Sequence, residues 1–335
     1  MLKFDEAAFL QDGMKTYACR KRIEEVIDDV AVKGYDNIIL TGIGGTTFEM
    51  MSVESIIRRY SGVEVVNLNA AEGMAARPDY ITNRSLVVTG SKSGDTPETV
   101  QICGWCKEKG ARVVVFTGKR DCPLAAAATD CILCDAPGME NTYLKFYLFA
   151  LYLLYKRGEF DAYPRFADQM AGLHRNLVAW KAQFEDEAHE IAVRYAKEPY
   201  QIWLGSGILW GEINMFTMCI LEEMQWMRTR AVTSSLFFHG TLELVDKDVP
   251  VYLVKGEDEY RALDERAEQF LKKYAEKLVI IDTADYKLDG IDDEFRVILT
   301  PIIFNTITRG RLAYHFEEQT GHDLEFRRYY RQFAY

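Results

Sequence analysis

Short apolar runs alternate with longer amphipathic segments along the first half of this chain of 335 residues. Such runs lie near residues 37–41, 63–67, 85–89, 112–117 and 131–134. The run at 112–117 is rich in valine, a β-branched residue that favours a strand. Strands that alternate with helices usually pair in parallel. The pattern therefore predicts a doubly wound α/β sheet, closed by a long apolar helix at 141–156.

The second half repeats this pattern in outline. Charged helical sequence at 165–197 leads to an apolar run at 200–204, which ends in Gly205, Ser206 and Gly207. Further strands are expected near 228–232, 249–254, 278–282 and 295–299, with helices at 260–276 and 300–318. We interpret the echo as an internal duplication. The prediction is two tandem doubly wound α/β domains of flavodoxin-like type, residues 1–160 and 161–335, with helical connections.

A loop dense in hydroxyl groups follows the apolar run at 85–89. Ser91, Ser93 and Thr96 surround one glycine, and Pro97 and Glu98 then open a helix. Proline and glutamate are both favourable in a first helical turn. The unpaired N–H groups of that turn, together with three hydroxyls, suit a phosphate dianion. Ordinary helix capping is the alternative, but it needs fewer hydroxyls.

A second hydroxyl-rich loop, at 41–47, follows the first apolar run and contains Gly45, Thr46 and Thr47. Loops at the carboxyl ends of neighbouring parallel strands face one crevice, where ligands bind. The loop fails the dinucleotide pattern G-x-G-x-x-G, because Thr47 stands where the third glycine is required, and it has no P-loop lysine. Two loops of this kind favour a sugar phosphate over a nucleotide.

Charge and cysteine content narrow the partners and the compartment. The net charge of −11 argues against a nucleic-acid or anionic-membrane partner. The longest apolar run, at 146–155, is too short to span a bilayer, and the first residues do not resemble a signal peptide. Seven cysteines, an odd number, favour reduced thiols and a cytoplasmic location. We expect the pairs Cys103/Cys106 and Cys131/Cys134 to be packing groups, and we expect no metal site.

Two residues of the second half are candidates for acid–base chemistry. Glu223 follows an apolar helical segment at 213–220, so we expect its carboxylate to be embedded among apolar groups with a raised pKa. Glu222 points about 100° away on the helix and is the exposed alternative. His239 lies between phenylalanines and a glycine and is a candidate general acid or base, a core histidine being the alternative. His174 and His189 lie in charged helical sequence and are expected to be solvated.

Taken together, these residues resemble the sugar isomerase (SIS) family of phosphosugar-binding domains. The first strand–helix loop of that family carries G-[ST]-[ST], here Gly45-Thr46-Thr47, and the third carries S-x-S-G-x-T, here residues 91–96. The resemblance covers nearly the whole chain in a two-domain form. It implies that the first domain holds a phosphate through Gly45, Thr46, Thr47, Ser91, Ser93 and Thr96, and that the second supplies catalytic groups.

The resemblance also selects the acid–base pair. Enzymes of this family place a glutamate sixteen residues before a His-Gly pair, and 239 − 223 = 16 selects Glu223 over Glu222. The sequences E-M-Q-W and F-F-H-G look most like those of deglycases that act on fructoselysine 6-phosphate or glucoselysine 6-phosphate. The resemblance implies Glu223 as base and His239 as acid, with the histidine reaching the site from a neighbouring subunit. It thus implies a homodimer or higher homo-oligomer with shared active sites, a small sugar-phosphate substrate and no cofactor.

Departures from the family leave alternatives. The glucosamine-6-phosphate synthases carry a lysine three residues before the glutamate and another near the C-terminus, whereas this chain has Ile220 and an arginine- and tyrosine-rich tail at 327–335. Amide transfer is therefore not expected. Five aromatic residues in the last ten predict that the tail docks on the protein: Phe326, Tyr329, Tyr330, Phe333 and Tyr335. An aldose–ketose phosphosugar isomerase and a non-catalytic phosphosugar sensor are the other functions that fit.

Overall fold

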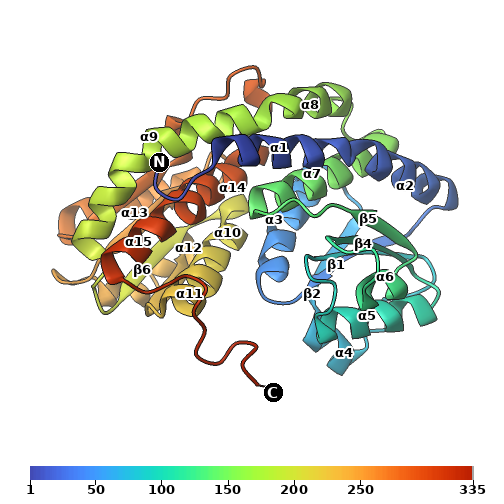
Figure 1. Ribbon diagram of the computed structural model, residues 1–335, viewed down its shortest axis with the longest axis horizontal. Helices are drawn as coiled ribbons and strands as arrows, with labels where there is room; N and C mark the ends of the chain where they lie inside the picture. Colours follow the sequence, from blue (N-terminus) through green and yellow to red (C-terminus); the bar gives the residue numbers. More distant parts are fainter. Residues whose placement is uncertain (334–335) are drawn as a thin grey trace. The chain divides into compact units, whose positions relative to one another are not determined.

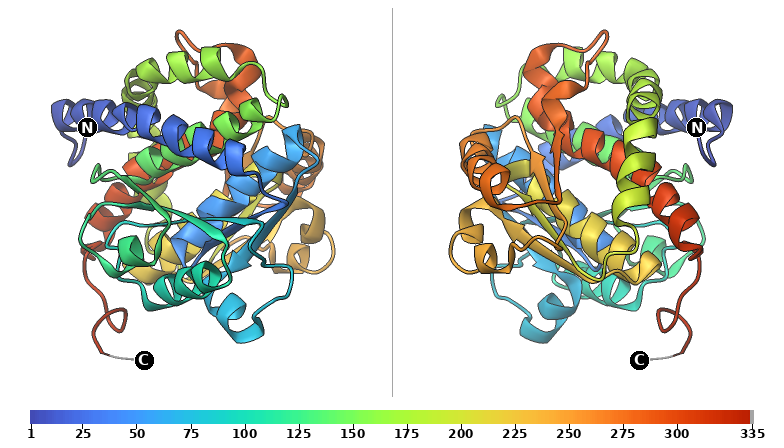
Figure 2. Two further views of the ribbon diagram at one scale, coloured as in Figure 1. Left: turned by 90° about the vertical axis from the view of Figure 1, so that its right-hand side faces the viewer. Right: turned by 90° about the vertical axis from the view of Figure 1, so that its left-hand side faces the viewer.

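The computed structural model describes residues 1–333, which fold as two units. The N-terminal unit comprises Ala7–His174, and the C-terminal unit combines Met1–Glu6 with the chain from Arg175 onward. Each unit is built around a parallel sheet that carries helices on both faces (Figures 1 and 2). Within residues 1–333, none of the helices has the length and apolar content that crossing a bilayer would require.

The sheet of the N-terminal unit has five parallel strands in the order β2-β1-β3-β4-β5. Their bounds are β1 Asn37–Gly42, β2 Glu64–Asn69, β3 Ser85–Ser91, β4 Arg112–Thr117 and β5 Asp130–Leu133. Residues of β1, β3 and β4 are almost wholly buried, as strands covered on both faces must be. All five strands expected in the first half are therefore confirmed.

Helices cover both faces of this sheet. They are α1 Glu6–Ala18, α2 Arg20–Lys33, α3 Gly45–Tyr60, α4 Ala70–Ala76, α5 Pro97–Glu108, α6 Pro123–Ala127, α7 Met139–Lys156 and α8 Tyr163–Gln169, followed by the short 3₁₀ turn η1 Met170–Gly172. On one face, Ile39, Val87 and Val113 pack with side chains of α4, α5 and α6, including Ile102. On the other face, Phe116 packs edge-on against Phe146 of α7. This core fixes the carboxyl ends of β1 and β3.

The C-terminal unit repeats the arrangement with four parallel strands in the order β7-β6-β8-β9. Their bounds are β6 Gln201–Gly205, β7 Thr229–Thr233, β8 Val251–Lys255 and β9 Leu278–Asp282. One face packs on α12 and α13 through a core that includes Leu204, Leu253 and Leu271. On the other face, Trp203 stacks on Tyr252 with ring centroids 4.0 Å apart. The first four strands of the two sheets thus follow one another in the same order, as an internal duplication predicts.

The helices and helical turns of the C-terminal unit are more irregular. They are α9 Leu173–Tyr195, η2 Gly207–Leu209, α10 Trp210–Met215, η3 Phe216–Glu222, α11 Glu223–Gln225, α12 Ser234–Phe237, η4 Thr241–Leu244, α13 Arg261–Tyr274, η5 Thr283–Asp285, η6 Asp293–Phe295, α14 Arg296–Ile307, η7 Thr308–Leu312 and α15 Ala313–Thr320. Two of these segments, η3 and η7, are π-helical. Such segments often occur at functional sites.

The strand expected at 295–299 is wrong. The segment begins the buried helix α14, and this sheet has no fifth strand within the described residues. An apolar run with no alternation cannot be assigned to a buried strand or a buried helix from periodicity alone. The twelve residues of α14 exceed the usual length of a strand, which is the signal that favours a helix.

Candidate active site

The two hydroxyl-rich loops of the N-terminal unit follow adjacent strands. Asn37–Leu40 of β1 pair in parallel with residues 85–88 of β3. The strand order reverses between β1 and β3, since β2 lies beyond β1 and β4 beyond β3. Open α/β sheets bind ligands outside the carboxyl ends of the strands at such a switch point. The loops predicted to hold a phosphate therefore lie where this fold places its ligands.

A hydrogen bond joins these two loops directly. The hydroxyl of Thr46 donates to the carbonyl oxygen of Gly90 at 3.3 Å. Gly45 is the first residue of α3, and Thr47 lies in its first turn, where Thr47 N donates to the Gly44 carbonyl at 3.1 Å. Within the described residues, the Thr47 hydroxyl has no hydrogen-bond partner. Gly45, Thr46 and Thr47 therefore form the first turn of α3, next to the end of β3.

The loop after β3 turns tightly before α5. The hydroxyls of Ser91 and Thr96 lie 3.2 Å apart, and Gly94 N donates to the Ser91 hydroxyl at 3.2 Å. Ser93 donates to the Asp95 carboxylate instead. Thr96 occupies the N-cap of α5, but its side chain makes no capping hydrogen bond. Ordinary capping by Thr96 therefore does not explain the hydroxyls of this loop.

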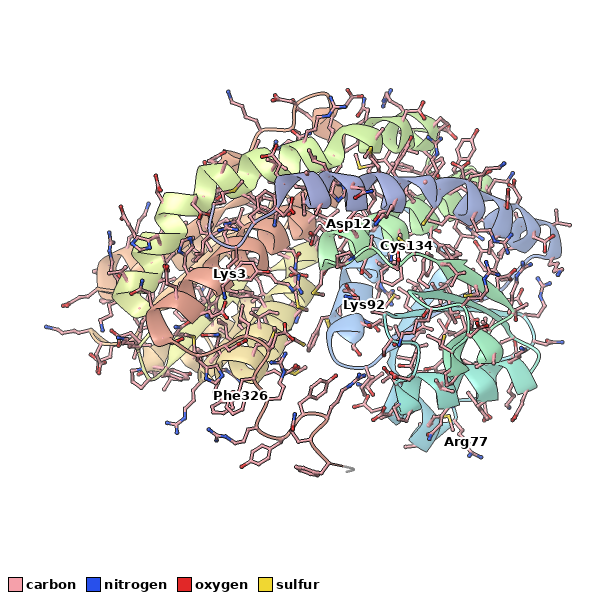
Figure 3. All side chains as sticks on the ribbon, viewed as in Figure 1. Lys3, Asp12, Arg77, Lys92, Cys134 and Phe326 are labelled. Carbon is pink, nitrogen blue, oxygen red and sulfur yellow. The ribbon has the colours of Figure 1, made fainter. Side chains whose placement is uncertain are left out.

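One glycine is required in this loop. Gly94 has φ +70°, and a Cβ there would lie 2.3 Å from the Cys122 sulfur. Lys92, labelled in Figure 3, is exposed on the same loop. A cation at the edge of the loop would favour an anionic ligand.

In the C-terminal unit, the strand order reverses between β6 and β8, and a carboxylate of the protein lies at this switch point. Asp258, in the loop after β8, accepts a hydrogen bond from Ile208 N at 2.8 Å and another from Tyr260 N at 3.0 Å. Ile208 lies at the start of the helical segment after β6, so this carboxylate occupies the position that corresponds to the hydroxyl-rich loops of the other unit. A Cβ on Gly207 would lie 2.0 Å from Asp258 Oδ2. The hydroxyl-rich motif is absent from this unit. The Asp258 carboxylate supplies the negative charge at the start of the helical segment instead.

Glu223 lies at an irregular point of the C-terminal unit. It follows directly on the π-helical segment η3 and begins the short helix α11. That helix ends at Trp226, which adopts a left-handed conformation with φ +56°. Bulky residues seldom adopt this conformation, and strain of this kind tends to gather at functional sites. The backbone on either side of Glu223 therefore points to a functional position.

The expected apolar surroundings of Glu223 are wrong. Its side chain is 30% exposed, and Oε1 accepts a hydrogen bond from Arg327 Nε at 2.9 Å. Ile220 and Met215 of the preceding segments are buried, but the chain turns the carboxylate away from them toward the C-terminal tail. Glu222 is exposed, as expected for the alternative, and accepts a hydrogen bond from the Thr229 hydroxyl at 2.6 Å.

The tail builds one wall of a cavity of about 580 Å³ beside Glu223. Arg327, Arg328, Tyr329 and Tyr330 contribute to its lining, as does Trp226. The Arg328 guanidinium lies over the Trp226 ring, 4.0 Å from its centroid. In the described part of the chain, no carboxylate pairs with Arg328. The cavity therefore brings the carboxylate of Glu223 and the guanidinium of Arg328 to one lining, which Glu222 and Arg228 share.

The aromatic residues of the tail pack on the protein less than the sequence predicts. Phe326, labelled in Figure 3, packs on Trp226 with ring centroids 5.3 Å apart but stays 57% exposed. Tyr329 and Phe333 also remain exposed, and Tyr335 lies outside the described residues. The arginines hold the tail in place more than the aromatic rings do.

His239 is exposed and is not a core histidine. It follows α12, and its N–H bonds the Leu236 carbonyl at 2.9 Å. Within the described residues, no hydrogen bond or ion pair links His239 to Glu223. Leu236 and Leu244, three residues before His239 and five after it in the chain, are 62% and 48% exposed. His239 therefore lies in a surface segment that also exposes two leucines.

The other histidines and the cysteines fall into clear classes. His174 is buried and lies 2.9 Å from Asn141 Oδ1, so the expectation that it is solvated is wrong, whereas His189 is exposed as expected. All seven cysteines are free thiols. Cys103 and Cys106 are wholly buried in the core of the N-terminal unit, and burial raises the pKa of the Cys106 thiol to about 12. Both are packing groups.

Comparison with known proteins adds an independent line of evidence. Residues 34–157 match the family model described as the SIS domain. The chain is 30% identical to a fructosamine deglycase of Bacillus subtilis over 94% of this chain and 97% of that protein. It is 22% identical to a fructoselysine 6-phosphate deglycase of Escherichia coli, over 92% of this chain and 89% of that protein.

Solved structures share the whole two-domain fold. A Bacillus subtilis crystal structure, provisionally named a phosphosugar isomerase, superposes with a TM-score of 0.89 and 28% identity, covering 96% of this chain and 99% of that one. The C-terminal domain of the glucosamine-fructose-6-phosphate aminotransferase of Francisella tularensis superposes with a TM-score of 0.78 and 17% identity, covering 95% of this chain and 96% of that one. At that identity the second likeness shows the fold alone.

Proposed function

Since the chain belongs to the SIS family in its two-domain form and is an enzyme, we propose that it is a deglycase. Its substrate would be a 6-phosphorylated adduct of a sugar and an amino acid. The products would be a hexose 6-phosphate and the free amino acid. Similarity to the Bacillus subtilis deglycase along nearly the whole chain carries this proposal. We also propose a cytoplasmic location, which the seven free thiols favour.

The phosphate of this substrate would bind at the switch point of the N-terminal unit. Its oxygens would accept hydrogen bonds from the backbone at the starts of α3 and α5 and from the hydroxyls of Thr46, Thr47, Ser91, Ser93 and Thr96. Gly45 would let the phosphate approach the backbone closely. Because the protein carries a net charge of −11, such local dipoles would have to outweigh the overall repulsion of a dianion.

Glu223 would start the chemistry as a general base. It would take a proton from C1 of the ketosamine, while His239 gives a proton to the oxygen at C2, and the product is an enaminol. Glu223 would then return its proton to C2 as the nitrogen loses one, which leaves a C1=N imine. Water adds to C1, and the amine departs. Each assisted proton transfer contributes about 10²- to 10⁴-fold to the rate.

The tail would recognise the amino-acid part of the substrate. An α-carboxylate can form two parallel hydrogen bonds with a guanidinium, and Arg328 is held over Trp226 without a carboxylate of its own. The pair between Arg327 and Glu223 orients the base at the same cavity. We therefore propose that adducts carrying a free α-carboxylate are preferred over adducts of simple amines.

His239 would act in a site shared between subunits. Its exposure and the neighbouring exposed leucines, Leu236 and Leu244, support a surface that a second copy covers. We propose a homodimer or higher homo-oligomer in which His239 of one chain serves the Glu223 of another.

Replacing Glu223 by glutamine tests the assignment of the base. Glutamine keeps the shape and a hydrogen-bond acceptor for Arg327 but cannot take up the proton. We expect Glu223→Gln to bind a fructosyl-amino acid 6-phosphate with nearly normal affinity in calorimetry and to release hexose 6-phosphate at least about 100-fold more slowly. Glu222→Gln is the matched control and should stay within about threefold of the parent rate. An active Glu223→Gln variant would overturn the assignment.

The same assay separates the other functions. An aldose–ketose isomerase would interconvert fructose 6-phosphate and glucose 6-phosphate without any amine. A sensor would bind both kinds of compound and convert neither. Release of a free amino acid from the adduct, with fructose 6-phosphate left unchanged, is the result that supports the deglycase.

A further inference from the structure

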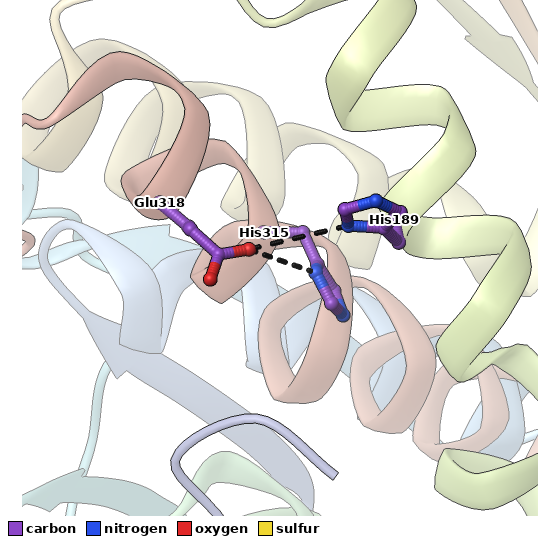
Figure 4. A group of neighbouring side chains, drawn as sticks. All are labelled: His189, His315 and Glu318. Carbon is purple, nitrogen blue, oxygen red and sulfur yellow. Dashed lines mark ion pairs between the residues drawn. The ribbon is translucent and has the colours of Figure 1, made fainter.

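A second group of ligand-type side chains lies in the C-terminal unit, and none of the roles above uses it. His189 comes from α9, and His315 and Glu318 come from α15, one helical turn apart on the same face (Figure 4). The Glu318 Oε2 atom lies 3.9 Å from His315 Nδ1 and 4.0 Å from His189 Nδ1. One ligand atom from each residue lies within 4.8 Å of the other two.

His315 is the unusual member of this group. Its side chain is 6% exposed, and neither ring nitrogen has a hydrogen-bond partner within residues 1–333. A buried polar group without a partner costs free energy, so its presence calls for an explanation. A neutral imidazole carries its proton on one ring nitrogen and keeps a free lone pair on the other. Only the neutral imidazole can bind a metal ion.

The surroundings of His315 favour one ring nitrogen as the free one. Glu185 Oε1 lies 3.4 Å from His315 Nε2. That carboxylate is held in place by the buried Arg311, whose Nη2 donates at 2.9 Å, and by Leu2 N at 2.7 Å. A small rotation of the ring would let a proton on Nε2 bond Glu185, which leaves Nδ1 unprotonated and near Glu318. Metal-binding histidines commonly have this carboxylate behind them.

We propose that His189, His315 and Glu318 form a binding site for a divalent transition-metal ion, with zinc as the best fit. Two imidazoles and one carboxylate are a common zinc set, and water completes the fourth position. Ligand atoms about 2.0–2.2 Å from a tetrahedral ion lie about 3.3–3.6 Å from one another. The present separations shrink to that range by small rotations of His189 and Glu318, whose side chains are 52% and 48% exposed. The ion would tie α15 to α9.

A titration of the full-length, chelator-treated protein with Zn²⁺ tests this site. We expect about one equivalent per chain and a melting temperature that rises as the zinc concentration rises. Co²⁺ should give the visible spectrum of a tetrahedral nitrogen–oxygen site, without the sulfur charge-transfer bands that binding to a free cysteine would produce. The readout does not involve sugar-phosphate turnover, so it stands apart from the proposed function.

Two exposed positions give variants that should still fold. His189→Ala and Glu318→Gln should each weaken zinc binding at least about tenfold and abolish the cobalt spectrum. Glu190→Gln is the control, since Glu190 is exposed on the same helix and pairs with Arg194 at 2.7 Å. The metal-free melting temperatures of all three should match the parent. Binding that needs millimolar zinc, or that survives both substitutions, would overturn the proposal.

Discussion

Glu223 shows that a distant residue can decide the surroundings of a side chain. The local sequence predicts an apolar setting, because buried residues precede it along the helix. The contact that matters comes from Arg327, 104 residues later, in a tail that shows no periodic pattern. The resemblance to the SIS family, with its spacing of sixteen residues before His239, selects Glu223, but its ion pair could not be foreseen from its neighbours.

Arg328 gives a test of substrate recognition at the residue scale. Arg328→Gln removes the charge that lies over Trp226. We expect KM for a fructosyl-amino acid 6-phosphate to rise about tenfold, which corresponds to about 1.4 kcal/mol of binding free energy. KM for the adduct of a simple amine should not change. Arg331→Gln, a change in the same tail but outside the cavity lining, serves as the control. Equal effects on the two substrates would contradict the proposed role.

Asp264 links stability to pH. It is 1% exposed, and burial raises its pKa to about 6, although Ser234 donates a hydrogen bond to it at 2.6 Å. Since the folded chain holds this proton above the pH at which the unfolded chain loses it, the free energy of unfolding falls as pH rises from about 4 to about 6.

Asp264→Asn should remove that dependence. Denaturant unfolding near pH 4 and near pH 7 should show a loss of stability about 2 kcal/mol smaller in the variant than in the parent protein. Asp248→Asn, at an exposed position, should leave the parent profile unchanged. An Asp264→Asn profile that follows the parent would contradict the assignment.

At the scale of elements, most strands and the positions of the two hydroxyl-rich loops followed from the sequence, and the irregular helices did not. Valine-rich runs such as 112–117 identify strands, because a strand covered by helices on both faces needs apolar side chains on both sides. The segment at 295–299 was assigned wrongly since its apolar residues do not alternate. The π-helical segment before Glu223 was not foreseen either, because it depends on tertiary packing rather than on local composition.

The turn before α5 gives a stability test at this scale. Gly94→Ala forces an alanine into φ +70° and against Cys122, so we expect a loss of about 2 kcal/mol or more in thermal unfolding. Gly104→Ala lies within α5, where a Cβ meets nothing within 4 Å, and should stabilise the protein by about 0.5–1 kcal/mol. Substrate binding should weaken only in Gly94→Ala. Equal effects of the two substitutions would show that the loop tolerates a side chain.

The loop after β8 gives a second test. Asp258→Ala leaves the N–H groups of Ile208 and Tyr260 without their acceptor, and we expect a loss of about 1–3 kcal/mol. Inorganic phosphate at about 10–100 mM should restore part of the lost stability, while chloride at matched ionic strength should not. The parent protein measured in parallel corrects for phosphate bound at the other unit. A variant that phosphate does not help would contradict the equivalence of the two positions.

At the scale of the whole molecule, the proposed sharing of sites between subunits makes a quantitative prediction. Glu223→Gln and His239→Ala should each be inactive alone. In a 1:1 mixture that exchanges subunits, half of the dimers are mixed, and each mixed dimer holds one site with both native residues. The mixture should therefore recover about a quarter of the parent activity. If Glu223 and His239 act within one chain, no activity returns.

Asp258 also bears on how a duplicated domain can diverge. A copy whose ligand site has been filled by its own side chain no longer needs a bound metabolite to satisfy its backbone. Selection can then alter the rest of that copy without regard to phosphate affinity. Under the proposed function, phosphate binding and acid–base chemistry would then reside in separate copies, and mutations that improve one need not compromise the other.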